Sequence, residues 1–226
     1  MAIKVFLSAG HGGSDPGAVA YGLKEKDINL QTLLACNEVL VRHGVSTVLS
    51  RTKDENDDVK SEVKEANASK ADIAVSFHAN AGKGDGFEAF YYKSSSKGKK
   101  LAEFCEKHVK AIGQNSRGLK TNSLYFTSKT KMPAVLVESF FIDNNKDNDI
   151  GDTVAEQKAF GVAYAKAILE YYGIAYVPEK VSTPDDKAPE GKLYHVQVGA
   201  YKNKANAEAT VQKLKAAGFT GVIKLS

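Results

Sequence analysis

The feature that most constrains the fold of this chain is a regular alternation of short apolar runs with longer segments of helical periodicity. Five apolar runs indicate strands, at residues 3–8, 45–50, 71–77, 86–92 and 134–139. Four segments with apolar residues three and four positions apart indicate helices, at residues 26–43, 57–70, 97–113 and 153–172. Strands and helices in turn favour an α/β fold, with a mostly parallel twisted sheet flanked by helices.

A change of composition after residue 176 divides the chain. Residues 177–191 (VPEKVSTPDDKAPEG) contain three prolines and many charges, which is typical of a linker. From residue 192 to residue 226, a strand pattern, an amphipathic helix and a second strand pattern predict a small C-terminal β-α-β unit. We therefore expect a large domain at residues 1–176, a linker at 177–191 and the small unit at 192–226.

Length and charge exclude several classes of protein. With 226 residues, the chain is long enough for one well-cored domain and about 50 further residues. Its net charge of +4 is small, and we expect no nucleic-acid partner. The start MAIKVFLSAG is too short and too soon interrupted for a signal peptide, and no apolar run approaches the length of a membrane span. We therefore expect a protein made in the cytoplasm, without a signal peptide and without a membrane span.

Four titratable side chains stand near the expected ends of strands and helices. His11 follows the first strand, His78 follows the third, and Glu138 ends the last, while Glu25 lies just before the first helix. Ligands gather at the carboxyl ends of the strands in parallel sheets, so these side chains could converge on one edge of the sheet. Two histidines with one carboxylate form a common protein ligand set for a catalytic zinc ion, which keeps a position open for water.

Taken singly, most of these residues also have a plain structural interpretation. His11 could be a polar turn residue, His78 could be satisfied by nearby backbone, and Glu25 could be a favourable charge at a helix N-terminus. Glu138 resists such an interpretation because it follows four apolar residues. A carboxylate there is costly unless a metal, a cation or a functional proton compensates it. Coincidence at all four positions is much less expected than at any one.

Four blocks within residues 3–173 resemble, in order and spacing, the motifs of the zinc-dependent N-acetylmuramoyl-L-alanine amidases of the type 3 family, which are bacterial autolysins and phage endolysins. The blocks are GHGGSDPGAVAYGLKEKDINL, SRTKDEND, EANASKADIAVSFHANAG and MPAVLVESFFIDN. The resemblance implies that His11, Glu25 and His78 bind one Zn²⁺ ion. It also implies that Glu138 is the catalytic carboxylate. The chain departs from the family pattern at Glu62, where an arginine is common.

The resemblance further implies a peptidoglycan hydrolase that cleaves the amide bond between N-acetylmuramic acid and the L-alanine of the stem peptide. Zinc would activate a water molecule, with Glu138 as general base and then general acid. Arg51 could contact a peptide carboxylate or the carboxylate of Glu25, and it could equally form a surface or structural ion pair. Asp15 could be a turn residue, and it is close enough to His11 to orient the imidazole ring. A zinc peptidase or deacetylase acting on the cell wall, and a non-catalytic wall-binding protein, stay open as alternatives. Such an enzyme would reach the wall after lysis or membrane breach.

The C-terminal unit carries a second resemblance. KLYHVQVGAYKNKANAEATVQKLKAAGF is similar to the sporulation-related (SPOR) peptidoglycan-binding repeat, in which two β-α-β halves form one domain. The pattern here covers only the first half, and a lone half leaves an edge strand open. We consider three arrangements: a truncated domain, a half that packs on the amidase domain, and a homodimer in which each chain contributes one half.

Overall fold

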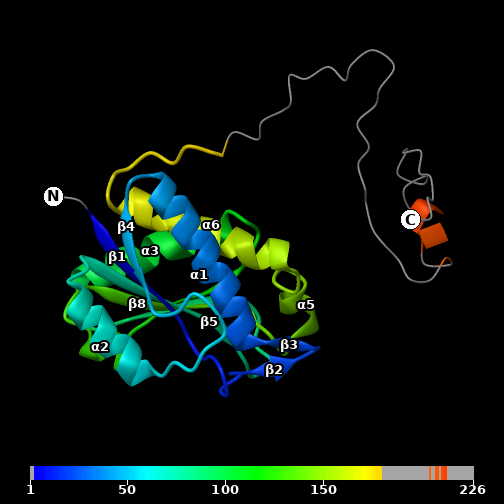
Figure 1. Ribbon diagram of the computed structural model, residues 1–226, viewed down its shortest axis with the longest axis horizontal. Helices are drawn as coiled ribbons and strands as arrows, with labels where there is room; N and C mark the ends of the chain where they lie inside the picture. The colour runs from blue at the N-terminus through cyan, green and yellow to red at the C-terminus, as the bar shows by residue number, and fades with distance from the viewer. Residues whose placement is uncertain (1–2, 180–203, 205–206, 209, 213–226) are drawn as a thin grey trace, which may run out of the picture. The chain divides into compact units, whose positions relative to one another are not determined.

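A computed structural model of the chain describes residues 3–179, together with residues 204, 207, 208 and 210–212. Its centre is a six-stranded sheet with the strand order β4-β1-β5-β8-β6-β7 (Figure 1). The strands are β1 (Lys4–Ala9), β4 (Ser46–Leu49), β5 (Ile73–Asn80), β6 (Phe87–Tyr91), β7 (Ser116–Lys120) and β8 (Ala134–Phe141). Strands β4, β1, β5 and β8 are parallel, whereas β6 runs antiparallel to β8 and parallel to β7. The expected mostly parallel sheet is confirmed.

Helices cover both faces of this sheet. On one face, α1 (Glu25–Arg42), α3 (Ser96–Lys110) and α6 (Val154–Tyr171) pack together, and α1 and α6 lie side by side in Figure 1. On the other face lie α2 (Val59–Ser69) and α4 (Tyr125–Lys129). Because both faces are covered, the strands are apolar on each side. Leu7 and Val137 belong to the larger core, and Phe6 and Leu136 belong to the smaller one.

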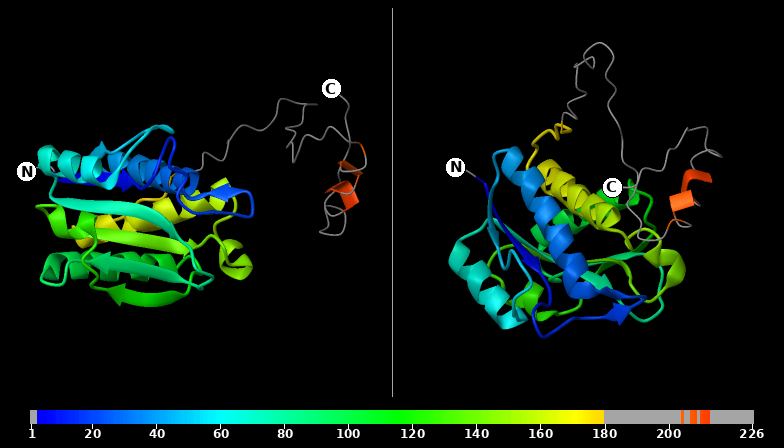
Figure 2. Two further views of the ribbon diagram at one scale, coloured as in Figure 1. Left: turned by 90° about the horizontal axis from the view of Figure 1, so that it is seen from below. Right: turned by 45° about the vertical axis from the view of Figure 1, so that its right-hand side comes forward.

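A small hairpin stands at one end of the sheet. It consists of β2 (Val19–Ala20) and β3 (Leu23–Lys24), which pair antiparallel apart from the main sheet. In both views of Figure 2 the hairpin lies at the same end of the sheet as the short helix α5 (Asn145–Asn148). The hairpin leads directly into α1, so Glu25 is the first residue of that helix.

Two strands are longer than the sequence pattern indicated. β5 was expected to end at residue 77 and β8 at residue 139, but they continue to Asn80 and Phe141. His78 and Glu138 therefore lie within strands rather than at their ends. The reason is that the two residues pair in register with each other, so the ladder between β5 and β8 continues through polar side chains.

Several short helices and strands are not predicted by the sequence pattern. The two hairpin strands, β7, α4 and α5 were not expected, and each of these strands and helices has five residues or fewer. β7 reads SRGLK and has neither an apolar run nor a regular alternation, because it is an edge strand of the sheet. Five residues or fewer offer too little sequence for a periodicity to appear.

The described residues of the C-terminal region are helical: Lys204, Ala207, Glu208, Thr210, Val211 and Gln212. Lys204 Nζ lies 3.5 Å from Glu208 Oε1, one helical turn away. These residues agree with the amphipathic helix expected there. Most of the expected linker, both strands of the small unit and the surface for a homodimer lie outside the described residues, and the boundaries at 176 and 191 remain predictions. Within the described part of the chain, no helix is both long and apolar enough to cross a membrane.

Candidate metal and catalytic site

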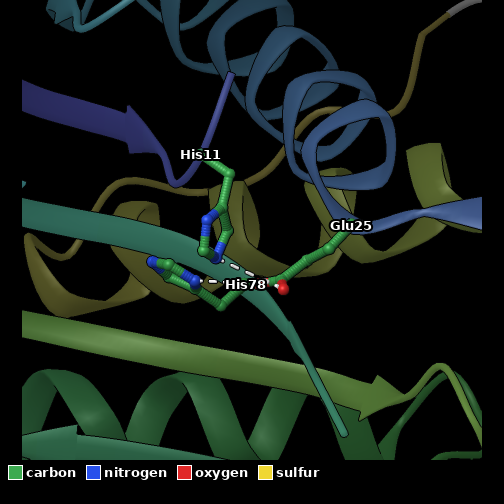
Figure 3. Close-up of side chains that lie close together, drawn as sticks. All are labelled: His11, Glu25 and His78. Atoms are coloured by element: carbon green, nitrogen blue, oxygen red, sulfur yellow. Dashed lines mark hydrogen bonds and ion pairs between the residues drawn. The ribbon is translucent and has the colours of Figure 1, made fainter. Parts of the chain in front are cut away.

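Three side chains from separate segments meet at the carboxyl ends of β1 and β5. His11 lies on the loop after β1, Glu25 begins α1, and His78 projects from β5 (Figure 3). One ligand atom from each lies within 4.8 Å of the others. Glu25 contacts both rings: its Oε2 is 3.3 Å from His11 Nε2, and its Oε1 is 2.9 Å from His78 Nδ1. These three residues, the ligand triad, are the three that the sequence singled out as ligands.

Two glycines allow the segments of the triad to approach one another. A Cβ atom on Gly10 would lie 2.0 Å from His78 Cε1, and one on Gly17 would lie 2.6 Å from Glu25 Oε2. Any larger residue at either position would displace a member of the triad, so the close approach requires glycine. His11 itself has a φ of +66°, a left-handed conformation that costs a non-glycine residue on the order of 1 kcal/mol.

The segment after β4 holds the glycine-rich loop in place. Asp54 accepts a hydrogen bond from the backbone N–H of Gly13 at 2.7 Å and pairs with Lys26 Nζ at 2.6 Å. Lys26 Nζ also donates to the carbonyl oxygen of Gly13 at 2.8 Å. The loop that carries His11 is therefore fixed from both sides, by a carboxylate and by the first turn of α1.

Arg51 contacts the backbone of the site rather than a carboxylate. Its guanidinium donates to the carbonyl oxygens of Ala9 at 3.0 Å and Lys26 at 2.7 Å. Arg51 is only 2% exposed, and among the described residues its hydrogen bonds go to carbonyl oxygens and not to the Glu25 carboxylate. A contact between Arg51 and a peptide carboxylate stays a prediction. Arg51 instead ties the end of β1, just before His11, to the first turn of α1.

The neighbours of the triad include one residue that the sequence indicated and one that it did not. Asp15 Oδ2 lies 2.8 Å from His11 Nδ1, which leaves Nε2 of that ring facing Glu25. Asn29 was not foreseen: its Nδ2 donates to the carbonyl oxygen of Gly10 at 2.9 Å and to Glu25 Oε1 at 3.4 Å. The spacing of four residues between Glu25 and Asn29 on one helix is the signal that could have identified it.

The charges of the metal-free triad support one another. The hydrogen bond with Glu25 raises the pKa of His11 to about 9. Burial acts to raise the pKa of Glu25, but hydrogen bonds from His11 and His78 outweigh it and lower that pKa. Burial likewise acts to lower the pKa of His78, but the hydrogen bond with Glu25 outweighs it and raises that pKa. Without a metal, the triad therefore favours protonated imidazoles around an ionised carboxylate.

Glu138 lies next to the triad on the same face of the sheet. It pairs in register with His78 on β5 and with Glu88 on β6, so the three side chains form a row across three strands. Its Oε2 atom is buried and has no hydrogen-bond partner among the described residues. Burial raises the pKa of Glu138 to about 7. A carboxyl group of this kind can accept and release a proton near neutral pH.

Two further buried carboxylates, Glu88 in this row and Glu62 on α2, were not singled out as functional from the sequence. Glu88 on β6 accepts hydrogen bonds from Arg117 Nε and Lys120 Nζ, both at 2.6 Å. Glu62 on α2 is also buried, and burial raises its pKa. A single acidic residue within the apolar run GFEAFYY is the signal that could have identified Glu88.

Comparison with known proteins gives two family matches. The family model described as N-acetylmuramoyl-L-alanine amidase matches residues 5–170, and the SPOR domain model matches residues 190–225. The chain is 32% identical over 227 residues to the sporulation-specific N-acetylmuramoyl-L-alanine amidase of Bacillus subtilis, covering 99% of this chain and 85% of that protein. It is 38% identical over 234 residues to the endolysin of Bacillus phage SPP1, covering 93% of this chain and 84% of the endolysin.

Solved structures agree with these matches. The catalytic domain of CwlV, an N-acetylmuramoyl-L-alanine amidase from Bacillus (Paenibacillus) polymyxa var. colistinus, superposes with a TM-score of 0.72 at 30% identity, covering 76% of this chain and 99% of that domain. The amidase AmiC2 of Nostoc punctiforme gives a TM-score of 0.71 at 32% identity, covering 75% of this chain and 97% of that one. The fold and the family model thus agree, and the chain belongs to the N-acetylmuramoyl-L-alanine amidases, which are peptidoglycan hydrolases.

Proposed function

We propose that the ligand triad holds one Zn²⁺ ion and that Glu138 moves the protons while the chain hydrolyses the amide bond between N-acetylmuramic acid and L-alanine. The observation that carries this proposal is the position of Glu138. Its buried Oε2, which has no hydrogen-bond partner within the described part of the chain, stands one strand away from His78, on the face of the sheet where the triad lies.

The donor set of the triad fits zinc. Two imidazole nitrogens and one carboxylate are a ligand set of catalytic zinc sites, and they leave a fourth position for water or substrate. The hydrogen bond between Asp15 and His11 supports the fit, because histidine ligands of metals commonly donate their second N–H to a carboxylate. The 4.8 Å limit on the distances between the three ligand atoms is short enough for one ion to reach them all.

Each residue then has a defined task in hydrolysis. Bound zinc would supply a Lewis acid that polarises the scissile carbonyl and acidifies water. Glu138 accepts the proton of the attacking water at Oε2 and delivers it to the leaving nitrogen of L-alanine. A pKa of about 7 suits both steps, since the group must be ionised first and protonated later. Asp15 holds the His11 ring through Nδ1, so Nε2 is the atom of His11 that would bind the ion.

The proposal is tested by measuring zinc content and wall-lytic activity on one preparation of the full chain. We expect one zinc ion per chain, loss of activity on chelation, and recovery when zinc is restored. The products should contain new free amino groups on L-alanine and no new reducing ends of glycan. A different product would favour a peptidase or a deacetylase, and full activity in zinc-free protein would overturn the zinc assignment.

A matched pair of variants tests the role of Glu138. Glu138→Gln should keep its zinc and lose about 100-fold or more of its activity, the usual effect of removing a general base. Glu103→Gln is the control, because Glu103 is an exposed carboxylate on α3. Wild-type activity in Glu138→Gln would refute the assignment.

We also propose that the C-terminal region binds peptidoglycan and that the enzyme acts on the cell wall. The SPOR match at residues 190–225 and the endolysin among the relatives support this proposal. Co-sedimentation with purified cell walls is the test. The full chain should pellet with the walls, and a chain ending at residue 178 should pellet less. Equal sedimentation of both would refute a binding role for this region.

A further inference from the structure

A pair of basic residues lies beside the catalytic row, on the side away from the triad. Glu88 faces Glu138 directly across the β6–β8 pair. From the edge strand β7, Arg117 Nε and Lys120 Nζ both reach Glu88 Oε1 at 2.6 Å. The other carboxylate oxygen of Glu88 accepts a hydrogen bond from Asn80 Nδ2 at 3.2 Å. The row that begins at the triad therefore continues through two carboxylates to two cations.

Contacts with Glu88 and Phe141 fix the orientation of the Arg117 guanidinium and leave its terminal N–H donors available. Its guanidinium lies over the ring of Phe141, with 5.3 Å from Cζ to the ring centroid, and its Nε is bonded to Glu88. Among the described residues, its two terminal nitrogens have no hydrogen-bond partner, and its side chain is 44% exposed. A fixed guanidinium whose two terminal nitrogens bond to no described residue can present the two parallel N–H groups that bind a carboxylate at two points.

The charge of this cluster also favours an anion. Glu88 compensates one of the two cations, so the cluster of Glu88, Arg117 and Lys120 has a net charge of +1. Lys120 is 34% exposed, so its ammonium group can add to the attraction on the same side. Glu88 is buried and acts as a positioning residue, because it fixes both cations without using the terminal nitrogens of Arg117.

We propose that Arg117, assisted by Lys120, binds a free carboxylate of the stem peptide on the leaving-group side of the scissile amide. This inference rests on the proposed function, because it takes the reaction to occur between the triad and Glu138. A stem peptide has a free carboxylate wherever a dicarboxylic amino acid is joined through only one of its two carboxyl groups.

The distances agree with that assignment. β7 lies two strands from β8, which is about 10 Å at the usual strand spacing of about 4.8 Å. The residue after L-alanine begins one Cα step further along the peptide, about 3.8 Å. A carboxylate on that residue or on the next one can therefore reach Arg117 while the amide of L-alanine lies at Glu138.

The test compares two soluble muramoyl-peptide substrates that differ in one group. In one, the residue after L-alanine has a free carboxylate, and in the other this group is a carboxamide. With the zinc-loaded full chain, wild type should prefer the carboxylate substrate. Arg117→Ala should lower kcat/KM for that substrate about 10-fold or more, chiefly through KM, as expected for the loss of charge-assisted hydrogen bonds. The carboxamide substrate should change by about twofold or less.

Two further variants sharpen the comparison. Arg117→Lys keeps the charge but loses the two-point contact, so it should recover only part of the preference for the carboxylate substrate. Lys97→Ala removes an exposed cation from α3 and should leave the preference unchanged. An equal loss on both substrates, or no loss on either, would overturn the inference while leaving the amidase assignment intact. If zinc-loaded wild type cleaves neither substrate nor cell walls, the proposed function fails instead.

Discussion

Replacing Glu138 by glutamine should make the metal-free chain more stable while making the enzyme inactive. The Oε2 atom of Glu138 is buried without a hydrogen-bond partner among the described residues. Burial raises its pKa from an ordinary 4.5 to about 7. At about 1.4 kcal/mol per pKa unit, the ionised group costs the folded chain about 3 kcal/mol. Glutamine has the same shape and no charge, so the variant escapes this cost.

The sign of the pH dependence follows from the direction of the shift. Because the folded pKa lies above the unfolded one, the folded state is fully stable with respect to this group below pH 4.5 and loses stability as the pH rises to 7. The stability advantage of Glu138→Gln should therefore be small at pH 5. By pH 8 it should have grown by about 2 kcal/mol.

Urea denaturation of the chelated full chain at pH 5, 6, 7 and 8 measures this difference directly. Glu103→Gln, which changes an exposed carboxylate, should show no such trend with pH. Activity on cell walls, measured with zinc restored, should fall about 100-fold or more. A stability difference that is the same at every pH would refute the burial argument. An active variant would refute the proton-transfer role.

Three further predictions concern the metal. Asp15→Asn should weaken zinc affinity about 10- to 100-fold, measured by competition with a chelator, since the hydrogen bond that orients His11 loses its charged acceptor; unchanged affinity would show that the contact is incidental. Gly10→Ala should leave less than one zinc ion per chain after dialysis, because the added Cβ would lie 2.0 Å from His78 Cε1; full occupancy would mean that the ring can move without losing the metal. Zinc affinity should fall as the pH is lowered below 9, because the raised pKa of His11 means that Nε2 must lose a proton before it can bind zinc. Titrations with zinc that gave the same affinity at pH 6, 7 and 8 would contradict this.

The ligand triad could be predicted from the sequence for a physical reason. His11 follows an apolar strand, Glu25 follows a hairpin, and His78 comes directly after the apolar run of β5, two residues before that strand ends. Such positions lie near the carboxyl edge of a parallel sheet. Asp15 could be predicted because it is four residues from His11 in the same turn. The sequence places Arg51 near the site, but it does not predict the carbonyl oxygens that accept its hydrogen bonds. Its sequence position shows a cation near the site, whereas its hydrogen bonds depend on how two loops fold against β1.

The cluster around Arg117 could not be predicted in this way. It depends on the register that places Glu88 opposite Glu138, and these residues are fifty positions apart in the sequence. It also depends on β7, an edge strand whose five residues have no strand pattern. The periodicity of a segment does not show which strands are neighbours in the sheet. It also does not show that β6 runs antiparallel to its neighbour β8.

The residues that we propose to take part in the reaction are those whose conformation or burial lowers the stability of the folded chain. His11 adopts a left-handed backbone conformation, and Glu138 has a buried oxygen with no hydrogen-bond partner in the region that the structure describes. The supporting residues do the opposite: Arg51 donates hydrogen bonds to four carbonyl oxygens, and Lys26 is paired with Asp54. These contacts offset the costs, because they hold the loops after β1 and β4 in place without using the side chains of the triad. A change in a supporting residue should therefore lower the stability of the chain before it lowers the activity of the folded fraction. A change at Glu138 should instead lower the activity without lowering the stability.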